Sequence, residues 1–93
     1  MLIKVHGLYE ERLELMINTE QPVPKLTIYI NPSHVVCVGE AKVKGADWVS
    51  SLIMLDIHSD GLYGNDHLEP RAYYVEESAE DINEKIYLAE GYK

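Results

Sequence analysis

The chain has 93 residues, 46% of them hydrophobic, with 16 acidic and 8 basic side chains and a formal net charge of −8. This length gives room for one hydrophobic core and predicts a single domain over residues 1–93. The negative charge repels phosphates, which argues against direct binding of nucleic acid. Because a chain of this size buries a modest share of its surface, we also expect it to form a homo-oligomer.

Cysteine usage and hydropathy give further expectations. Cys37 is the only cysteine, so no disulfide forms within the chain, and its valine neighbours predict a buried, unreactive thiol. The first residues lack the apolar region of a signal peptide, and no apolar run approaches the ~18 residues of a membrane span. The sequence therefore predicts a cytoplasmic protein without a membrane partner.

The first half of the chain is predicted to form strands. Residues 2–6 alternate apolar and polar side chains and end at Gly7. Residues 13–18 are apolar with glutamates around them, and they fit a strand or a short helical turn. Residues 26–30 are β-branched and aromatic, and turn residues lead from them into a second aliphatic run at 35–39. These two runs predict an antiparallel hairpin.

The second half of the chain contains the longest strand pattern. Residues 48–58 are apolar on both faces at their centre, which predicts a central strand covered on each side. A long polar loop over 59–70 follows, and residues 71–75 resume the strand.

A helix is predicted over residues 79–90. Ser78 is a favoured N-cap residue, and Asp81 stands three positions later, close to a capping box. Ile82, Ile86 and Ala89 follow at helical spacing, and Gly91 is placed to end the helix. The predicted fold class is therefore α+β: an antiparallel β-meander or small open barrel of about five strands, with one C-terminal helix packed on it.

Two polar loops carry side chains that suit a small ligand. Lysines in the first loop supply an anion-binding edge, and the tryptophan beside them offers a ring for stacking or an interface anchor. The second loop adds hydrogen-bonding groups and an arginine. The residues predicted to bind a ligand or a partner are Lys42, Lys44, Trp48, Asn65, Asp66, His67 and Arg71.

Metal and catalytic sites are not predicted. Asp56 and His58 share one face of a strand, a spacing that suits a metal, but no second ligand pair completes the set. A solvated loop is the simpler interpretation. No nucleophile lies in a Gly-flanked turn, and no glycine motif cradles a phosphate. We expect a protein that is not an enzyme and that has no cofactor.

Negative charge is densest near the end of the chain. The predicted acidic surface consists of Glu76, Glu77, Glu80, Asp81 and Glu84. Together with Glu10, Glu11 and Glu14, these carboxylates are expected to lie on one face. Such a face can imitate nucleic acid and bind the basic site of another protein.

Residues 26–36 (LTIYINPSHVV) and 73–82 (YYVEESAEDI) resemble the small flagellar, swarming-motility proteins of the FlbD type and their short phage and prophage relatives. The shared pattern is an apolar strand, an Asn-containing turn, an aliphatic strand and a further strand leading through Glu77 and Ser78 into a helix. The resemblance implies a β-meander with a C-terminal helix and a non-enzymatic, oligomeric, intracellular accessory protein.

The leading functional prediction is a phage-type accessory protein that acts by binding in the host cytoplasm. One form is an inhibitor of a host defence protein, such as an anti-CRISPR protein, that works through the acidic surface. The alternatives are a homo-oligomeric protein that binds or sequesters a nucleotide-like ligand, and a flagellar or structural assembly factor.

Overall fold

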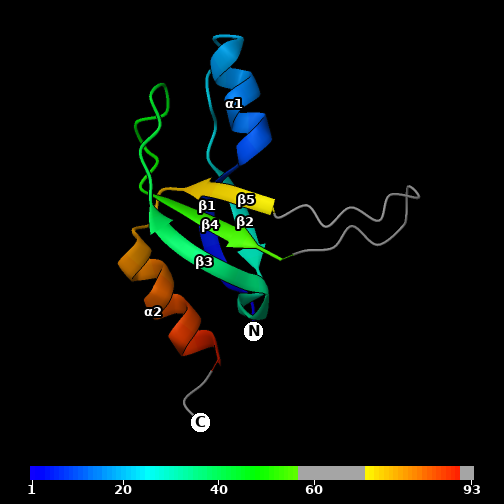
Figure 1. The fold of residues 1–93 in the computed structure, drawn as a ribbon, viewed down its shortest axis with the longest axis vertical. Coiled ribbons are helices and arrows are strands. Elements are labelled where there is room, and N and C mark those ends of the chain that lie inside the picture. The colour runs from blue at the N-terminus through cyan, green and yellow to red at the C-terminus, as the bar shows by residue number, and fades with distance from the viewer. Residues whose placement is uncertain (57–70, 91–93) are drawn as a thin grey trace, which may run out of the picture.

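One antiparallel sheet organises the computed structural model, which describes residues 1–56 and 71–90 (Figure 1). Five strands pair in the order β2-β1-β5-β4-β3. The elements in chain order are β1 (Ile3–Tyr9), α1 (Glu10–Asn18), β2 (Leu26–Ile30), the 3-10 turn η1 (Pro32–His34), β3 (Val35–Glu40), β4 (Ser51–Leu55), β5 (Arg71–Val75) and α2 (Ala79–Glu90). The predicted α+β class, a five-stranded antiparallel sheet with a C-terminal helix packed on it, is confirmed.

The main core lies between the sheet and α2. Val5, Ile53 and Val75 come from three neighbouring strands, and each is fully buried. Ile82 of α2 is also fully buried among them, and Ile86 packs against the same cluster. The predicted apolar stripe of the helix therefore faces the sheet, and burial of these aliphatic groups is the main force that holds α2 in place.

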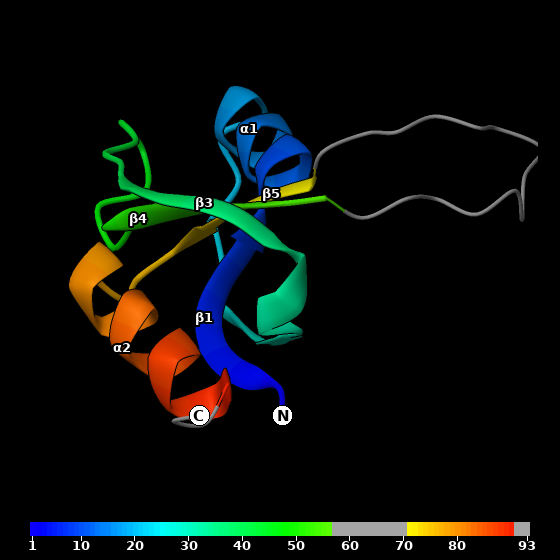
Figure 2. The same cartoon turned by 60° about the horizontal axis from the view of Figure 1, so that its bottom comes forward.

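A second core lies on the other side of the sheet. Leu13 of α1 is fully buried with Leu8 of β1 and with Ala46 and Val49 from the segment between β3 and β4. Figure 2 shows α1 and α2 on opposite sides of β3, β4 and β5. The sheet therefore separates the two helices.

The prediction of a strand over residues 13–18 is wrong, because this segment belongs to α1. Leu13 is buried and Met16 and Ile17 pack with it, while Glu14 and Leu15 are exposed. This burial at i, i+3 and i+4 is the pattern of a helix on a core, so the helical alternative is the correct one.

The predicted hairpin of residues 26–30 and 35–39 is also wrong. β2 pairs with β1 and β3 pairs with β4, so the two strands form opposite edges of the sheet. The turn η1 joins the edges. From Ile30 to Val35 the chain reaches at most about 18 Å, whereas the outer strands of a flat five-stranded sheet lie about 19 Å apart. The sheet must curl to bring its edges together at this end.

The strands β1 and β4 differ in length from the strands that the sequence predicts. β1 continues through Gly7 to Tyr9, where it pairs with β5, and Gly7 permits this pairing because a Cβ there would collide with the carbonyl oxygen of Tyr74. β4 covers only Ser51–Leu55, and Trp48 lies in a turn before it. β5 is the middle strand of the five, and β4, within the predicted central strand of residues 48–58, is an interior strand between β5 and β3. Positions 57–58, like Gly91, lie outside the described residues.

Cys37 is exposed, which corrects the prediction of a buried thiol. The pairing of β3 with β4 shifts register between Val35 and Cys37. Val35 and Val38 take the inward positions and pack against the main core. The bulge therefore leaves Cys37 on the outer side of an edge strand.

Candidate functional site

The described part of the chain places the lysines and Arg71 of the predicted ligand set at different ends of β4. Lys42 and Lys44 precede β4, whereas Arg71 begins β5 opposite Leu55, at the other end of β4. A five-residue strand is about 13 Å long, so β4 separates the two groups. Asn65, Asp66 and His67 lie outside the described residues.

Trp48 packs in the second core rather than in an open site. Its side chain is half-buried, and its indole Nε1–H donates to the carbonyl oxygen of Val23 at 3.3 Å. This bond fastens the segment before β2 to the excursion before β4. Asp56, from the metal pair considered above, is exposed and lies 3.2 Å from His34 Nδ1, while His58 is outside the described residues.

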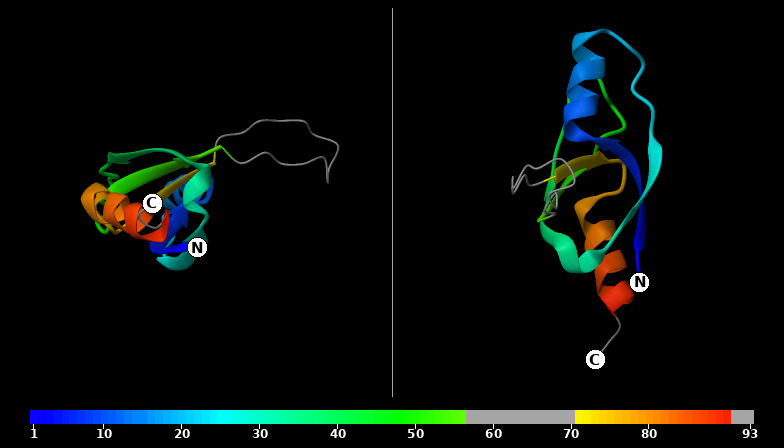
Figure 3. Two further views of the ribbon diagram at one scale, coloured as in Figure 1. Left: turned by 90° about the horizontal axis from the view of Figure 1, so that it is seen from below. Right: turned by 90° about the vertical axis from the view of Figure 1, so that its right-hand side faces the viewer.

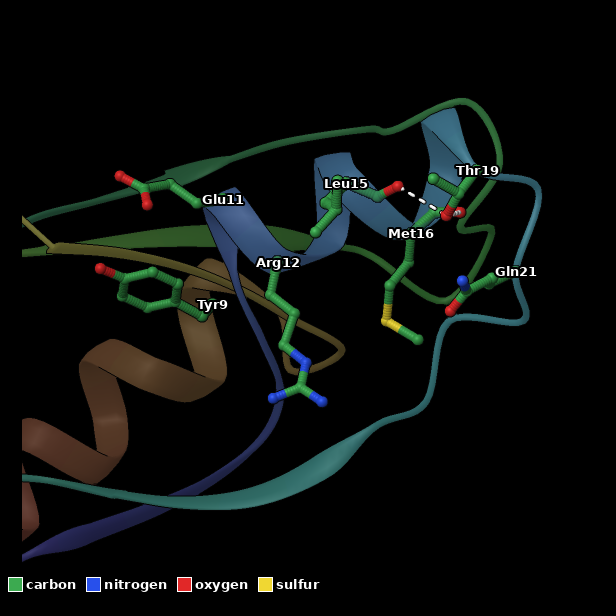
Figure 4. Close-up of a pocket in the computed structure, with 7 residues that line it drawn as sticks. All are labelled: Tyr9, Glu11, Arg12, Leu15, Met16, Thr19 and Gln21. Carbon is green, nitrogen blue, oxygen red and sulfur yellow. Dashed lines mark hydrogen bonds between the residues drawn. The ribbon is translucent and has the colours of Figure 1, made fainter.

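A groove lies between α1 and the segment that returns to β2, and Figure 4 shows it. It has a volume of about 550 Å³. Leu15 and Met16 form its apolar part, and the Arg12 side chain extends into the opening. The residues that line it are Tyr9, Glu11, Arg12, Leu15, Met16, Thr19 and Gln21. The Tyr9 ring meets the Tyr73 ring edge to face with centroids 5.6 Å apart, so the groove offers a ligand or a peptide side chain an aliphatic wall and one guanidinium.

The end of α1 shapes this groove. The Thr19 hydroxyl lies within donating distance of the carbonyl oxygens of Leu15 at 2.9 Å and Met16 at 3.3 Å, and these carbonyls also accept the backbone N–H groups of Thr19 and Gln21. Glu20 then adopts a positive φ of 56° and turns the chain back toward β2.

On the inner side of α1, burial and the charges of Glu10 and Glu14 raise the pKa of Tyr74, so its phenol remains protonated.

A polar cluster that the sequence interpretation missed joins β1 to the start of α2. His6 donates its backbone N–H to Glu77 Oε1 at 2.9 Å, and its Nδ1 lies 2.7 Å from Glu77 Oε2. Glu76 pairs with Lys25 at 2.7 Å, and this hydrogen bond lowers the pKa of the Glu76 carboxyl. Residues 6 and 77 are 71 positions apart, so no local spacing predicts their contact.

The contacts of this cluster support a structural role rather than a metal site. Ligand atoms of His6, Glu76 and Glu77 lie within 4.8 Å of one another, as a metal site would require. However, Glu77 Oε1 accepts the backbone N–H of His6, Glu77 Oε2 lies 2.7 Å from His6 Nδ1, and Glu76 Oε2 pairs with Lys25, so all three residues already have partners within the protein. The cluster therefore fixes the corner between β5 and α2.

The outer face of α2 carries the remaining acidic residues of the predicted surface. Glu80, Asp81 and Glu84 are exposed, and no ion pair engages them within the described residues. The same helix also exposes two large side chains, Tyr87 at 61% and Leu88 at 55%. A shallow groove of about 370 Å³ is lined by Glu77, Asp81, Glu84, Lys85 and Leu88. We call the surface formed by Glu80, Asp81, Glu84 and Leu88 the α2 face.

The acidic residues do not form one continuous face. Glu77 and Glu76 are held by His6 and Lys25, and the helix α1, which carries the other glutamates, lies at the opposite end of the molecule from α2 (Figure 3, right). The exposed negative charge is therefore divided, and the α2 face combines it with exposed apolar side chains.

Comparison with known proteins returns no match to a protein-family model, a curated protein or a solved structure. Neither helix in the described part of the chain has the length and apolar character needed to span a bilayer.

Proposed function

We propose that the protein acts by binding and that it docks a basic protein surface on the α2 face. The single observation that carries this proposal is the position of Leu88, an exposed apolar side chain, next to Asp81 and Glu84, whose carboxylates have no ion-pair partner among the described residues. Carboxylates steer a basic partner and set its orientation, while desolvated apolar groups provide most of the affinity.

The chemistry of the partner follows from this surface. Glu80, Asp81 and Glu84 occupy the first half of α2, with Lys85 as the basic residue of the adjoining groove. A protein site that normally holds nucleic-acid phosphates offers the complementary charge. The resemblance of residues 26–36 and 73–82 to FlbD-type proteins and their phage relatives supports a phage accessory role, with a host defence protein in the bacterial cytoplasm as the target.

Affinity capture from a nuclease-treated bacterial lysate tests the proposal. The immobilised protein should retain an identified nucleic-acid-binding protein, and added double-stranded DNA should displace it. Neutralising the α2 face with Glu80→Gln, Asp81→Asn and Glu84→Gln should weaken that complex at least about tenfold at low salt, because the partner loses three opposing charges.

A matched variant separates local charge from net charge. Glu11→Gln, Glu14→Gln and Glu20→Gln also remove three exposed carboxylates, but these lie on or next to α1. This control should bind like the natural protein. Equal weakening by both triple variants, or no weakening by the α2 variant, would show that the docking surface is elsewhere.

The groove beneath α1 favours a second function, binding of a small anionic ligand that has a ring. Arg12, Leu15 and Met16 line the groove, so a guanidinium can meet a phosphate while the apolar wall contacts a base. This combination matches the chemistry predicted for a nucleotide-like ligand, but on different residues from Lys42, Lys44 and Arg71.

Thermal-shift measurements with linear and cyclic nucleotides at millimolar concentration test this second function. A ligand in excess of its Kd should raise Tm by about 5 °C or more, and Arg12→Gln should remove that shift. Lys44→Gln, which removes an exposed cation outside the groove, should leave the shift intact. The absence of any stabilising nucleotide would rule this function out.

A further inference from the structure

The two edges of the sheet differ in how well they are protected against other strands. β3 carries a register shift between Val35 and Cys37, and it ends at Gly39 and the charged Glu40. Bulges and charges of this kind discourage pairing with another chain. β2 has neither of these features. Its five residues, LTIYI, pair with β1 in one unbroken register and include no charge, proline or glycine.

The outer edge of β2 is also open within the described part of the chain. β1 is the one strand that pairs with β2 there. Leu26 is 47% exposed and Tyr29 is 61% exposed, although both belong to a strand of apolar and aromatic composition. An uncharged, regular edge with exposed large side chains is a template for addition of another strand.

We propose that a second copy of this chain occupies the edge, with the two β2 strands antiparallel about a two-fold axis at Ile28. In this register Leu26 of each copy faces Ile30 of the other, and Thr27 faces Tyr29. Residues directly opposite in an antiparallel pair lie on the same face. Apolar Leu26, Ile28 and Ile30 therefore stay together on the α2 side of the sheet.

Self-complementarity and charge select a second copy over another partner. The β2 sequence LTIYI has aliphatic residues at both ends and at its centre, so it presents a similar pattern in either direction. The same contact surface can therefore serve both copies, as a two-fold interface requires. Two copies with a net charge of −8 each repel one another, so they can meet only where acids are absent. In this register the flanking Lys25 faces Asn31, and no like charges stand opposite each other.

The dimer would also affect how the α2 face is presented. The axis is perpendicular to the sheet, so both α2 helices lie on the same face of one continuous sheet. Two acidic faces would then be available to a partner with repeated basic sites, which increases apparent affinity through multivalency. The dimer itself does not depend on the proposed function, because β2 and the outer surface of α2 share no residue.

Mass measurement in solution, by light scattering after gel filtration and by sedimentation, tests the dimer with charge variants. The double variant Thr27→Glu, Tyr29→Glu should raise the dimer dissociation constant at least about tenfold. In the dimer, position 27 of each copy faces position 29 of the other, so two pairs of carboxylates repel each other across the axis. Within each chain the same positions pair with His6 and Lys4, so the folded monomer should tolerate them.

The rescue variant is Thr27→Lys with Tyr29→Glu. It places opposite charges at both cross-axis contacts and should restore the dimer. A natural protein that remains monomeric would overturn the proposal, as would a dimeric Thr27→Glu, Tyr29→Glu variant or a monomeric rescue variant. Circular dichroism confirms that each variant is folded. Failure of the dimer would leave partner docking on α2 untouched, and failure of docking would leave the dimer untouched.

Discussion

Replacing Ile82 with alanine should detach α2 from the sheet more effectively than any other single truncation in that helix. Ile82 is the fully buried residue of α2, and it lies in one cluster with Val5, Ile53 and Val75. The proposed docking surface is on the outer side of the same helix, so its geometry depends on this contact.

The size of the effect can be worked from the burial. Ile82→Ala removes three carbon groups worth about 0.8 kcal/mol each in transfer free energy. The cavity left in the core adds to this, so the free energy of unfolding should fall by about 3 to 4 kcal/mol. A domain of this length is stabilised by roughly 5 to 14 kcal/mol in total, so the loss is large.

Urea unfolding followed by circular dichroism measures this change. Leu88→Ala is the matched control, because Leu88 is an aliphatic residue of the same helix that is 55% exposed, and its truncation should cost about 0.5 kcal/mol or less. A loss below about 1 kcal/mol for Ile82→Ala, or equal losses for both variants, would refute the packing of α2 described above.

Three further predictions concern other parts of the fold. Gly7→Ala should lower the free energy of unfolding by about 3 kcal/mol, measured in urea, because the added Cβ collides with Tyr74 of β5. Ser78→Ala should cost about 1 kcal/mol by removing the cap of α2, and Ser78→Asp should recover most of it in the same assay. The third concerns pH. Since Lys25 lowers the pKa of Glu76, this pair stabilises the folded state above the ordinary carboxyl pKa of 4.5, and the contribution disappears as pH falls through the lower folded value. Acid unfolding of Lys25→Met should therefore show a shallower loss of stability below pH 4.5 than the natural protein. An unchanged slope would mean that the ion pair contributes nothing.

Local sequence patterns predicted the elements whose signals are short-range. The Ser78 cap and the spacing of Ile82 and Ile86 need only one helical turn of information, and α2 begins and packs as they indicate. The helix α1 was also readable, because Leu13, Met16 and Ile17 follow helical spacing. Its contiguous apolar run also fits a strand, and burial of Leu13 against the second core decides for the helix.

Strand pairing depends on contacts that a linear pattern does not contain. The turn at Asn31 and Pro32 is typical of a hairpin, yet β2 pairs with β1 and β3 pairs with β4, at opposite edges of the sheet. The same limit applies to the site. His6 meets Glu77 only after β1 lies beside β5, and the groove at Arg12 exists only once α1 is a helix.

The proposed docking on α2 is tested most directly by the salt dependence of Kd between this protein and the basic partner recovered by capture. The natural protein and the Glu11, Glu14, Glu20 variant should bind with the same Kd, and both should weaken steeply as salt rises. The Glu80, Asp81, Glu84 variant should bind more weakly at low salt and depend less on salt. Superimposable curves for the natural protein and the α2 variant would contradict docking on α2.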